Sequence, residues 1–298
     1  MANSRYLDFD LLASISNMEL LAQTVVEGFL LGLHRSPFRG FSVEFAEYRQ
    51  YTPGDEVRFI DWRVYARSDR FYVKQYEEET NVACHLLLDA SASMDFRGPR
   101  SPMSKLDYAS SLAACLAYFM MRQRDSVSLT IFDSEIRTML PARQHHSHLQ
   151  RILSALENCQ AGNTTNVAAP MHDMADALKR RGMVILISDL LDDPEQVLSA
   201  LQHFHFQGHD VLVLHVMDNA ELALDYERMT EFVDSESGEK LLVSPAAIRS
   251  KYNSELERFL AAYEKGAARV RADYKLFDTK TPLELALSEY LHKRSKRV

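Results

Sequence analysis

Cysteine is scarce in this sequence, and its few copies are isolated. The 298 residues include three cysteines, Cys84, Cys115 and Cys159, each alone in an apolar stretch. Their spacing matches neither a metal-binding pattern nor a redox-active pair. We therefore expect three reduced thiols in a core, which is typical of a cytoplasmic protein.

A long uninterrupted apolar run is also missing. The longest apolar stretch, residues 11 to 33, contains Glu19, Gln23 and Glu27. Carboxylates at these positions would be costly in a bilayer, whereas the helical spacing of the apolar residues suits packing on a protein core. The first ten residues are polar and mixed in charge, so we expect no signal peptide and no membrane span.

Glycine, proline and positive charge are limited as well. Ten glycines and nine prolines are spread over the whole length, without a repeat or a flexible linker. Hydrophobic residues make up 46% and charged residues 26%, as in an ordinary globular protein of one large domain or two small ones. The net charge of −8 argues against nucleic acid or an anionic membrane as the partner.

The pattern along the chain changes near residue 80. Residues 1–80 predict an N-terminal helix, from about 10 to 33, followed by a small β-rich segment. Residues 81–298 alternate apolar strands with amphipathic helices, which predicts an α/β domain. Its sheet should be doubly wound and mostly parallel, with helices on both faces. An inserted hairpin is expected near 225–243, before a long helix from Pro245.

The individual elements follow from the same periodicity. We expect a hairpin made of strands 127–132 and 136–140. The other predicted strands are 82–88, 183–188, 211–217 and 274–277. The predicted helices are 105–122, 148–158, 167–180, 194–206, 245–270 and 282–292.

Three polar clusters follow predicted strands or short loops in the α/β region. Asp89-x-Ser91-x-Ser93 ends an apolar strand, Thr164 to Asn166 form a polar loop, and Ser188-Asp189 ends a second strand. Ligands of open α/β sheets bind at the carboxyl ends of strands, so one fold could bring the clusters together. Oxygen donors without nitrogen or sulfur suit a small divalent cation such as Mg²⁺.

These clusters resemble the metal-ion-dependent adhesion site of von Willebrand factor A domains. The resemblance implies a von Willebrand factor A-like fold and a site for Mg²⁺ or Mn²⁺ that captures an acidic side chain of a protein partner. Carried onto this sequence, the site consists of Asp89, Ser91, Ser93, Thr165 and Asp189. Thr165-Asn166 matches the end of the family's Gly-Gly-Thr-Asn pattern, whereas residues 162 to 164 depart from it, which leaves Thr164 as an alternative.

An upstream segment resembles a second family signature. Residues 47 to 62, Glu-Tyr-Arg-Gln-Tyr-Thr-Pro-Gly-Asp-Glu-Val-Arg-Phe-Ile-Asp-Trp, are similar to those of the family named domain of unknown function 58. Val-Ile-Leu-Ile-Ser-Asp at 184 to 189 fits the same family. That resemblance implies an adaptor or chaperone-like role beside a MoxR-type AAA+ ATPase. Many members carry membrane helices at the amino end; since no membrane span is expected in this sequence, we expect it to belong to the soluble members.

The enzyme alternative is a haloacid-dehalogenase-like, magnesium-dependent phosphohydrolase. Its nucleophilic Asp also follows an apolar strand, but its general acid, two residues further on, is Ser91 here. Loss of a general acid typically costs 10²–10⁴-fold in rate. No P-loop and no Gly-x-Ser-x-Gly elbow is present either. The sequence therefore favours a binding module over an enzyme.

Several groups also have plain structural interpretations. Asp89 and its serines could simply cap a helix. The Pro53 to Trp62 segment predicts a tight turn with an ion pair and a buried indole. The histidines near 145 and 205 lack the spacing of a zinc site, so we place them on solvated helix faces.

Overall fold

The structure is a computed structural model. It describes residues 17–35, 48–51, 62, 65, 67, 70–74, 83–162, 167–224, 226, 228–234, 238–285 and 287–288. Contacts divide the chain into two compact units, residues 1–32 with 82–298, and residues 33–81. The N-terminal helix thus belongs with the α/β unit, whereas the sequence pattern had grouped it with the β-rich segment.

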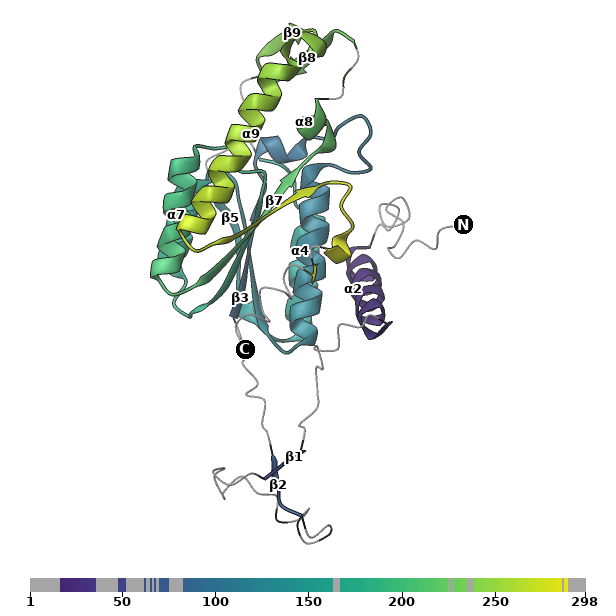
Figure 1. Ribbon diagram of the computed structural model, residues 1–298, viewed down its shortest axis with the longest axis vertical. Coiled ribbons are helices and arrows are strands. Elements are labelled where there is room, and N and C mark those ends of the chain that lie inside the picture. Colours follow the sequence, from purple (N-terminus) through teal and green to yellow (C-terminus); the bar gives the residue numbers. More distant parts are fainter. Residues whose placement is uncertain are drawn as a thin grey trace. The chain divides into compact units, whose positions relative to one another are not determined.

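A six-stranded sheet forms the centre of the larger unit (Figure 1). Its order is β10-β7-β6-β3-β4-β5, and every neighbouring pair is parallel except β4 with the edge strand β5. The strand bounds are β3 Ala83–Asp89, β4 Ser126–Phe132, β5 Ile136–Arg143, β6 Gly182–Ser188, β7 Asp210–Met217 and β10 Asp273–Asp278. The expected mostly parallel α/β sheet is confirmed.

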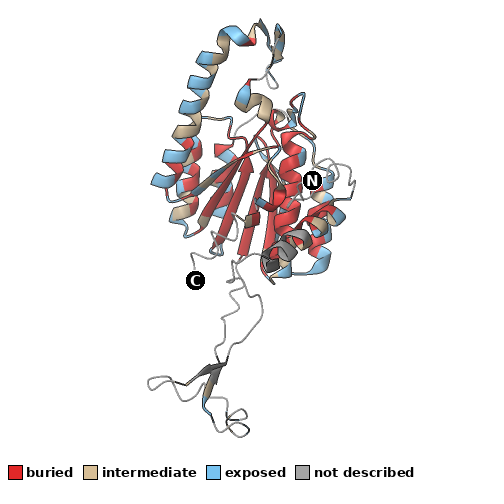
Figure 2. Cartoon of the chain, turned by 45° about the vertical axis from the view of Figure 1, so that its right-hand side comes forward, coloured by how far each residue is buried: buried red, intermediate tan, exposed pale blue. Residues whose placement is uncertain are grey.

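Helices cover both faces of this sheet, which explains why its central strands are continuous apolar runs. On one face α4 packs with α5, and on the other α6 and α7 share a core with the end of α9. Figure 2 shows the resulting buried strands in red. The helices of this unit are α2 Met18–Arg35, α4 Lys105–Arg122, α5 His146–Glu157, α6 Ala168–Ala177, α7 Pro194–Phe206, α8 Asn219–Ala223 and α9 Pro245–Arg269, with a short 3₁₀ helix, η2, at Ala92–Asp95.

Helix α4 shows why several boundaries could be predicted. The Ser104 hydroxyl caps it by accepting a hydrogen bond from the amide of Asp107 (3.1 Å), and the Asp107 carboxylate accepts one from the amide of Ser104 (3.2 Å). This reciprocal cap fixes the first turn at the predicted residue. Helix α7 likewise begins with an Asp193 cap and a proline in its first turn. The predicted bounds of both helices are confirmed.

A hairpin lies within the region where the sequence predicts an insertion. It consists of β8 (Thr230–Val233) and β9 (Lys240–Val243), paired antiparallel. In Figure 1 it lies at the far end of α9. None of the helices in the described part of the chain combines the length and apolarity needed to cross a membrane.

The smaller unit contains a two-stranded antiparallel pair, β1 (Tyr48–Gln50) with β2 (Tyr72–Lys74). The rings of Tyr65 and Phe71 stack at 4.4 Å, and the Trp62 ring lies edge-on to both. The prediction of a buried indole was wrong, because Trp62 is 55% exposed. Residues 52–61, which carry the predicted turn, lie outside the described part of the chain.

Two histidines lie inside the sheet rather than on its surface. His85 of β3 and His215 of β7 are buried, with ring nitrogens 2.7 Å from Ser128 Oγ and Tyr274 Oη. Burial is the main cause that lowers the pKa of each to about 4. The sequence had placed His148 and His209, with the other histidines of residues 145–148 and 203–209, on solvated helix faces; that expectation was wrong for these two, which are buried.

Lowering the pH from 7 to 4 should therefore destabilise the fold through these two imidazoles. Between the unfolded pKa of 6.5 and the folded value of about 4, the unfolded chain binds more protons, so stability falls as the pH falls. Each histidine contributes up to about 3 kcal/mol to this loss. The measurement is the urea unfolding free energy at pH 7, 5.5 and 4 for the wild type and His215→Asn. The difference between the two curves of unfolding free energy against pH gives the contribution of His215 without that of the carboxylates. Parallel curves would contradict the lowered pKa of His215.

Candidate metal-binding site

The site begins where two neighbouring parallel strands end. β3 and β6 pair in register from Ala83 with Gly182 to Leu88 with Ile187, so their carboxyl ends lie side by side. Asp89 is the last residue of β3, and Asp189 follows the last residue of β6. The parallel pairing thus brings together two clusters that are about 100 residues apart in the sequence.

The Asp89 loop is tightly organised. Asp89 Oδ1 accepts the amide hydrogen of Ser91 at 2.9 Å, and the Oγ atoms of Ser91 and Ser93 are 3.0 Å apart. Asp89 Oδ2 accepts the hydroxyl of Ser188 at 2.6 Å. This bond ties the two strand ends together, and Ser188 Oγ itself accepts the amide hydrogen of Leu190 at 2.9 Å.

Burial dominates the electrostatics of this loop. Asp89, Ser91 and Asp189 have no exposed surface, and Ser93 keeps 7%. Burial, reinforced by the nearby Asp189 charge, raises the pKa of the Asp89 carboxyl to about 7, although hydrogen bonds from Ser188 and Ser91 oppose the rise. An additional positive charge at this point would therefore be strongly favoured.

A buried lysine already neutralises the second carboxylate. Lys105 Nζ lies 2.7 Å from Asp189 Oδ2 and 2.6 Å from Glu221 Oε1, and the lysine side chain is fully buried. Burial is the largest influence on its pKa and lowers it, but the two carboxylates together outweigh burial and raise the pKa. Lys105 therefore stays charged and holds Asp189 beside the site.

The oxygen set fits a small divalent cation. Adjacent ligands of an octahedral Mg²⁺ at 2.0–2.1 Å lie about 2.9 Å from each other. The separation of 3.0 Å between the two serine Oγ atoms matches this spacing. Asp89 and Asp189 supply negative charge behind the hydroxyls, so the donors suit Mg²⁺ or Mn²⁺. Within the described ranges, no three His, Cys, Asp or Glu side chains converge as a transition-metal site would require.

Thr165, the fifth predicted residue, lies outside the described part of the chain, as does the alternative Thr164. Residues on both sides of this segment are hydrogen-bonded to the site region. The amide of Gly162 donates to the carbonyl oxygen of Ala90 at 2.6 Å, and the amide of Val167 donates to Asp192 Oδ2 at 2.8 Å. Of the predicted set, the structure thus brings together Asp89, Ser91, Ser93 and Asp189.

Sequence reasoning missed the roles of Lys105, Glu221 and the Ser188 hydroxyl. Lys105 carried one available signal, because a cation in the first turn of a helix is disfavoured by the helix dipole and suggests a compensating partner. The identity of that partner depends on long-range packing. Glu221 lies on α8, which is reached only through β7, and no local pattern links it to residue 105.

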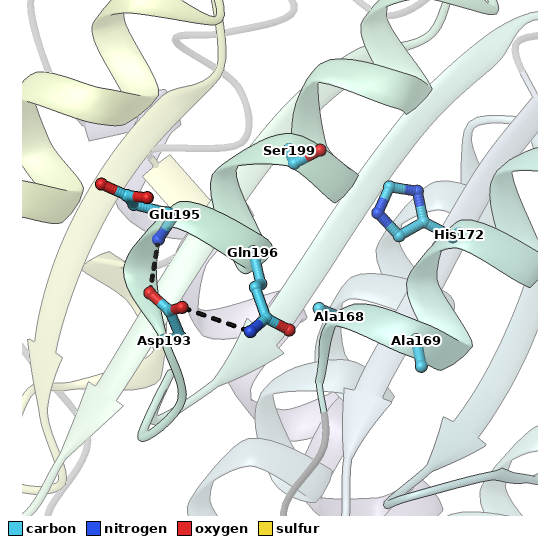
Figure 3. A pocket seen from close by; sticks show the side chains of 7 residues that line it. All are labelled: Ala168, Ala169, His172, Asp193, Glu195, Gln196 and Ser199. Carbon is cyan, nitrogen blue, oxygen red and sulfur yellow. Dashed lines mark hydrogen bonds between the residues drawn. The ribbon is translucent and has the colours of Figure 1, made fainter.

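Two surface hollows flank the region. The first, of about 450 Å³, borders the Asp89 loop and is lined by Asp95, Arg97, Ser104, Leu106, Asp107, Cys159, Gln160 and Ala161. The second, of about 550 Å³, lies between α6 and α7 and includes His172 (Figure 3). Asp193 there accepts the Glu195 amide at 3.0 Å and the Gln196 side-chain amide at 3.2 Å. Since these groups serve the start of α7, we place the functional site at Asp89.

The chain thus has an α/β sheet with buried carboxylate and hydroxyl oxygens at the carboxyl ends of its strands. Residues 47–260 match the family described as Protein of unknown function DUF58. The match covers well over half of the chain, and the chain belongs to this family. The resemblance noted in the sequence is thereby confirmed.

The chain is also similar to individual proteins. The uncharacterized protein Rv1480 of Mycobacterium tuberculosis is 29% identical over 265 residues, which are 88% of this chain and 81% of the relative. Among solved structures, BatB of Bacteroides thetaiotaomicron is 16% identical with a TM-score of 0.49, covering 72% of this chain and 99% of that one. The SpRpn10 VWA domain is 10% identical with a TM-score of 0.41, covering 70% and 95%. These structural likenesses concern the von Willebrand factor A-like fold alone.

Proposed function

We propose that this protein is a metal-dependent protein-binding module. Asp89, Ser91, Ser93, Thr165 and Asp189 would hold Mg²⁺ or Mn²⁺, whose charge would attract a carboxylate of the partner. The observation that carries the proposal is the convergence of four of these residues at the ends of β3 and β6, with the serine Oγ atoms 3.0 Å apart.

The electrostatics support binding in this form. A cation in so buried a site is poorly screened by water, so its attraction for a carboxylate is strong. Asp189 is already paired with Lys105, which leaves Asp89 as the carboxylate in need of positive charge. Ser91 occupies the position at which a phosphohydrolase requires an acid, and this favours adhesion over catalysis.

For the partner we propose a MoxR-type AAA+ ATPase, in keeping with the family resemblance, and for this chain an adaptor or chaperone-like role. We place the pair in the cytoplasm. The chain's net negative charge argues against nucleic acid as an alternative partner.

The test is a calorimetric titration of the purified ATPase from the same genome, combined with a separate titration of Mg²⁺ alone. We expect EDTA or Asp89→Ala to weaken ATPase binding by about a hundredfold or more, as expected when a central charged contact is lost. Asp176→Ala, which removes a carboxylate that is 70% exposed on α6, should leave binding unchanged.

The two titrations separate the parts of the proposal. Binding of Mg²⁺ without binding of the ATPase would contradict the partner and leave the metal site standing. ATPase binding that is indifferent to EDTA and to Asp89→Ala would contradict the metal mechanism. Turnover of p-nitrophenyl phosphate with Mg²⁺, abolished by Asp89→Asn, would show an enzyme instead.

A further inference from the structure

The hairpin and the first half of α9 stand away from the α/β core. Helix α9 has 25 residues and is therefore about 37 Å long. All residues from 246 to 262 are described, and none of them is fully buried; burial resumes at Tyr263. Figure 2 shows this exposed part beyond the buried sheet. We call residues 228–234 and 238–257 the hairpin arm.

Contacts at its base hold the hairpin arm in place. Rings of Tyr226 and Phe232 meet edge-to-face at 5.4 Å. Arg249 Nη2 donates to the carbonyl oxygens of Leu224 at 3.2 Å and Tyr226 at 3.3 Å. An isolated two-stranded hairpin is marginally stable in water, so these contacts organise the arm in advance of any partner.

The arm presents a concentration of exposed apolar side chains. Of the eleven large hydrophobic residues that are exposed in the described chain, four lie within fourteen residues of the arm. By the strand register, Val233 and Leu242 share one face of the hairpin, whereas Leu241 lies on the other face with Phe232. Single exposed apolar residues are ordinary, but a cluster on a projection indicates a contact surface. The four are Met229, Val233, Leu241 and Leu242, each between 54% and 62% exposed.

The negative charge of the sequence around this cluster indicates which kind of partner it would bind. Residues 225–240 contain six carboxylates and two basic side chains, so they carry half of the chain's net charge of −8. So acidic a stretch of sequence repels nucleic acid and anionic membranes. Its complement is a protein surface with apolar groups framed by lysine and arginine.

The base of the arm adjoins the metal site. Tyr252 Oη of α9 donates to the carbonyl oxygen of Glu221 at 2.7 Å, and the Glu221 carboxylate contacts Lys105, which holds Asp189. Helix α8 follows the carboxyl end of β7, the same edge of the sheet that carries Asp89 (Figure 1). A protein bound at Asp89 would therefore approach beside the arm.

We propose that the hairpin arm is a second contact surface for the same protein partner, gripping a lysine- and arginine-framed apolar patch while the metal site takes a carboxylate. This inference rests on the proposed function for the identity of that partner. Two contacts on one rigid unit would bind more tightly than either contact alone.

The test places the photo-cross-linker p-benzoylphenylalanine at Leu242 of the full chain in its own cells. The matched control is the same group at Phe206, which is 75% exposed at the end of α7 and therefore lies at the opposite edge of the sheet. We expect at least about tenfold more adduct from position 242, because an interface position excludes competing water contacts. Mass spectrometry should map the adduct to a partner peptide with lysine or arginine beside apolar residues. Equal yields, or an acidic peptide, would overturn the inference.

Variants then separate the arm from the metal site. With the partner so identified, Val233→Ser/Leu242→Ser should weaken binding about tenfold or more, whereas Phe206→Ser should not change it. If the arm variant binds normally and Asp89→Ala does not, the arm inference fails and the metal mechanism stands. If Asp89→Ala binds normally and the arm variant does not, the arm is confirmed and the metal mechanism fails.

Discussion

Replacing Lys105 with methionine should lower the free energy of unfolding by about 3–5 kcal/mol. Methionine keeps most of the side-chain volume but removes the ammonium that lies 2.7 Å from Asp189 and 2.6 Å from Glu221. Asp189 would then be a fully buried charge without its partner, which is the costly way to break an ion pair. Urea unfolding monitored by circular dichroism measures the loss.

A surface ion pair supplies the matched control for Lys105→Met. Lys240 lies 3.1 Å from Glu231 on the hairpin, and both side chains are more than half exposed. Lys240→Met should change stability by less than about 1 kcal/mol, because exposed pairs contribute little. The double variant Lys105→Met/Asp189→Leu should recover part of the lost unfolding free energy, since it also removes the buried Asp189 carboxylate that Lys105→Met leaves without its partner. Equal effects of the two single lysine variants would contradict the role of Lys105.

Asp89→Asn should stabilise the metal-free protein at pH 8 and abolish its response to Mg²⁺. The carboxyl has a folded pKa of about 7 against 3.8 in the unfolded chain, so keeping it charged above pH 7 costs folding free energy. Removing the charge should raise the unfolding free energy by about 1–3 kcal/mol at pH 8. Near pH 4 the difference should vanish, because the folded wild type is then protonated at Asp89.

The same measurement with Mg²⁺ reports on the site. At a hundred times its dissociation constant, a ligand that binds only the folded state stabilises it by about 2.7 kcal/mol. We expect that gain for the wild type and for Asp176→Asn, and none for Asp89→Asn. If Mg²⁺ still stabilises Asp89→Asn, the ion binds elsewhere on the protein, and the proposed metal site is wrong. An Asp89→Asn variant that is less stable than the wild type at pH 8 would contradict the raised pKa.

Most elements of the α/β unit could be predicted because their signals are local. Met183 to Ser188 is an apolar run with polar residues after it, and Ser104 with Asp107 forms a cap that can be recognised in four residues. The predicted burial of Trp62 was wrong because the burial of an indole depends on what packs over it. The rings of Tyr65 and Phe71 lie edge-on to it, and the side chain stays 55% exposed.

In the candidate site, too, the local features could be predicted from the sequence and the long-range contacts could not. Asp89, Ser91, Ser93 and Asp189 could be identified because strand ends and hard oxygen donors are both visible in sequence. The Ser188 hydrogen bond to Asp89 and the ion pairs of Lys105 join residues 84 to 116 positions apart. No periodicity encodes such pairs, since they exist only once the sheet order is set.

The sequence by itself determined an acidic α/β protein with an oxygen-rich strand end, because periodicity, charge and residue type are local properties. Only the tertiary structure decided which charges meet. Parallel pairing of β3 with β6 brought Asp89 and Asp189 together, and the start of α4 placed Lys105 between Asp189 and Glu221. The raised pKa of Asp89 follows from that packing, because burial and a neighbouring charge are properties of the fold rather than of the residue.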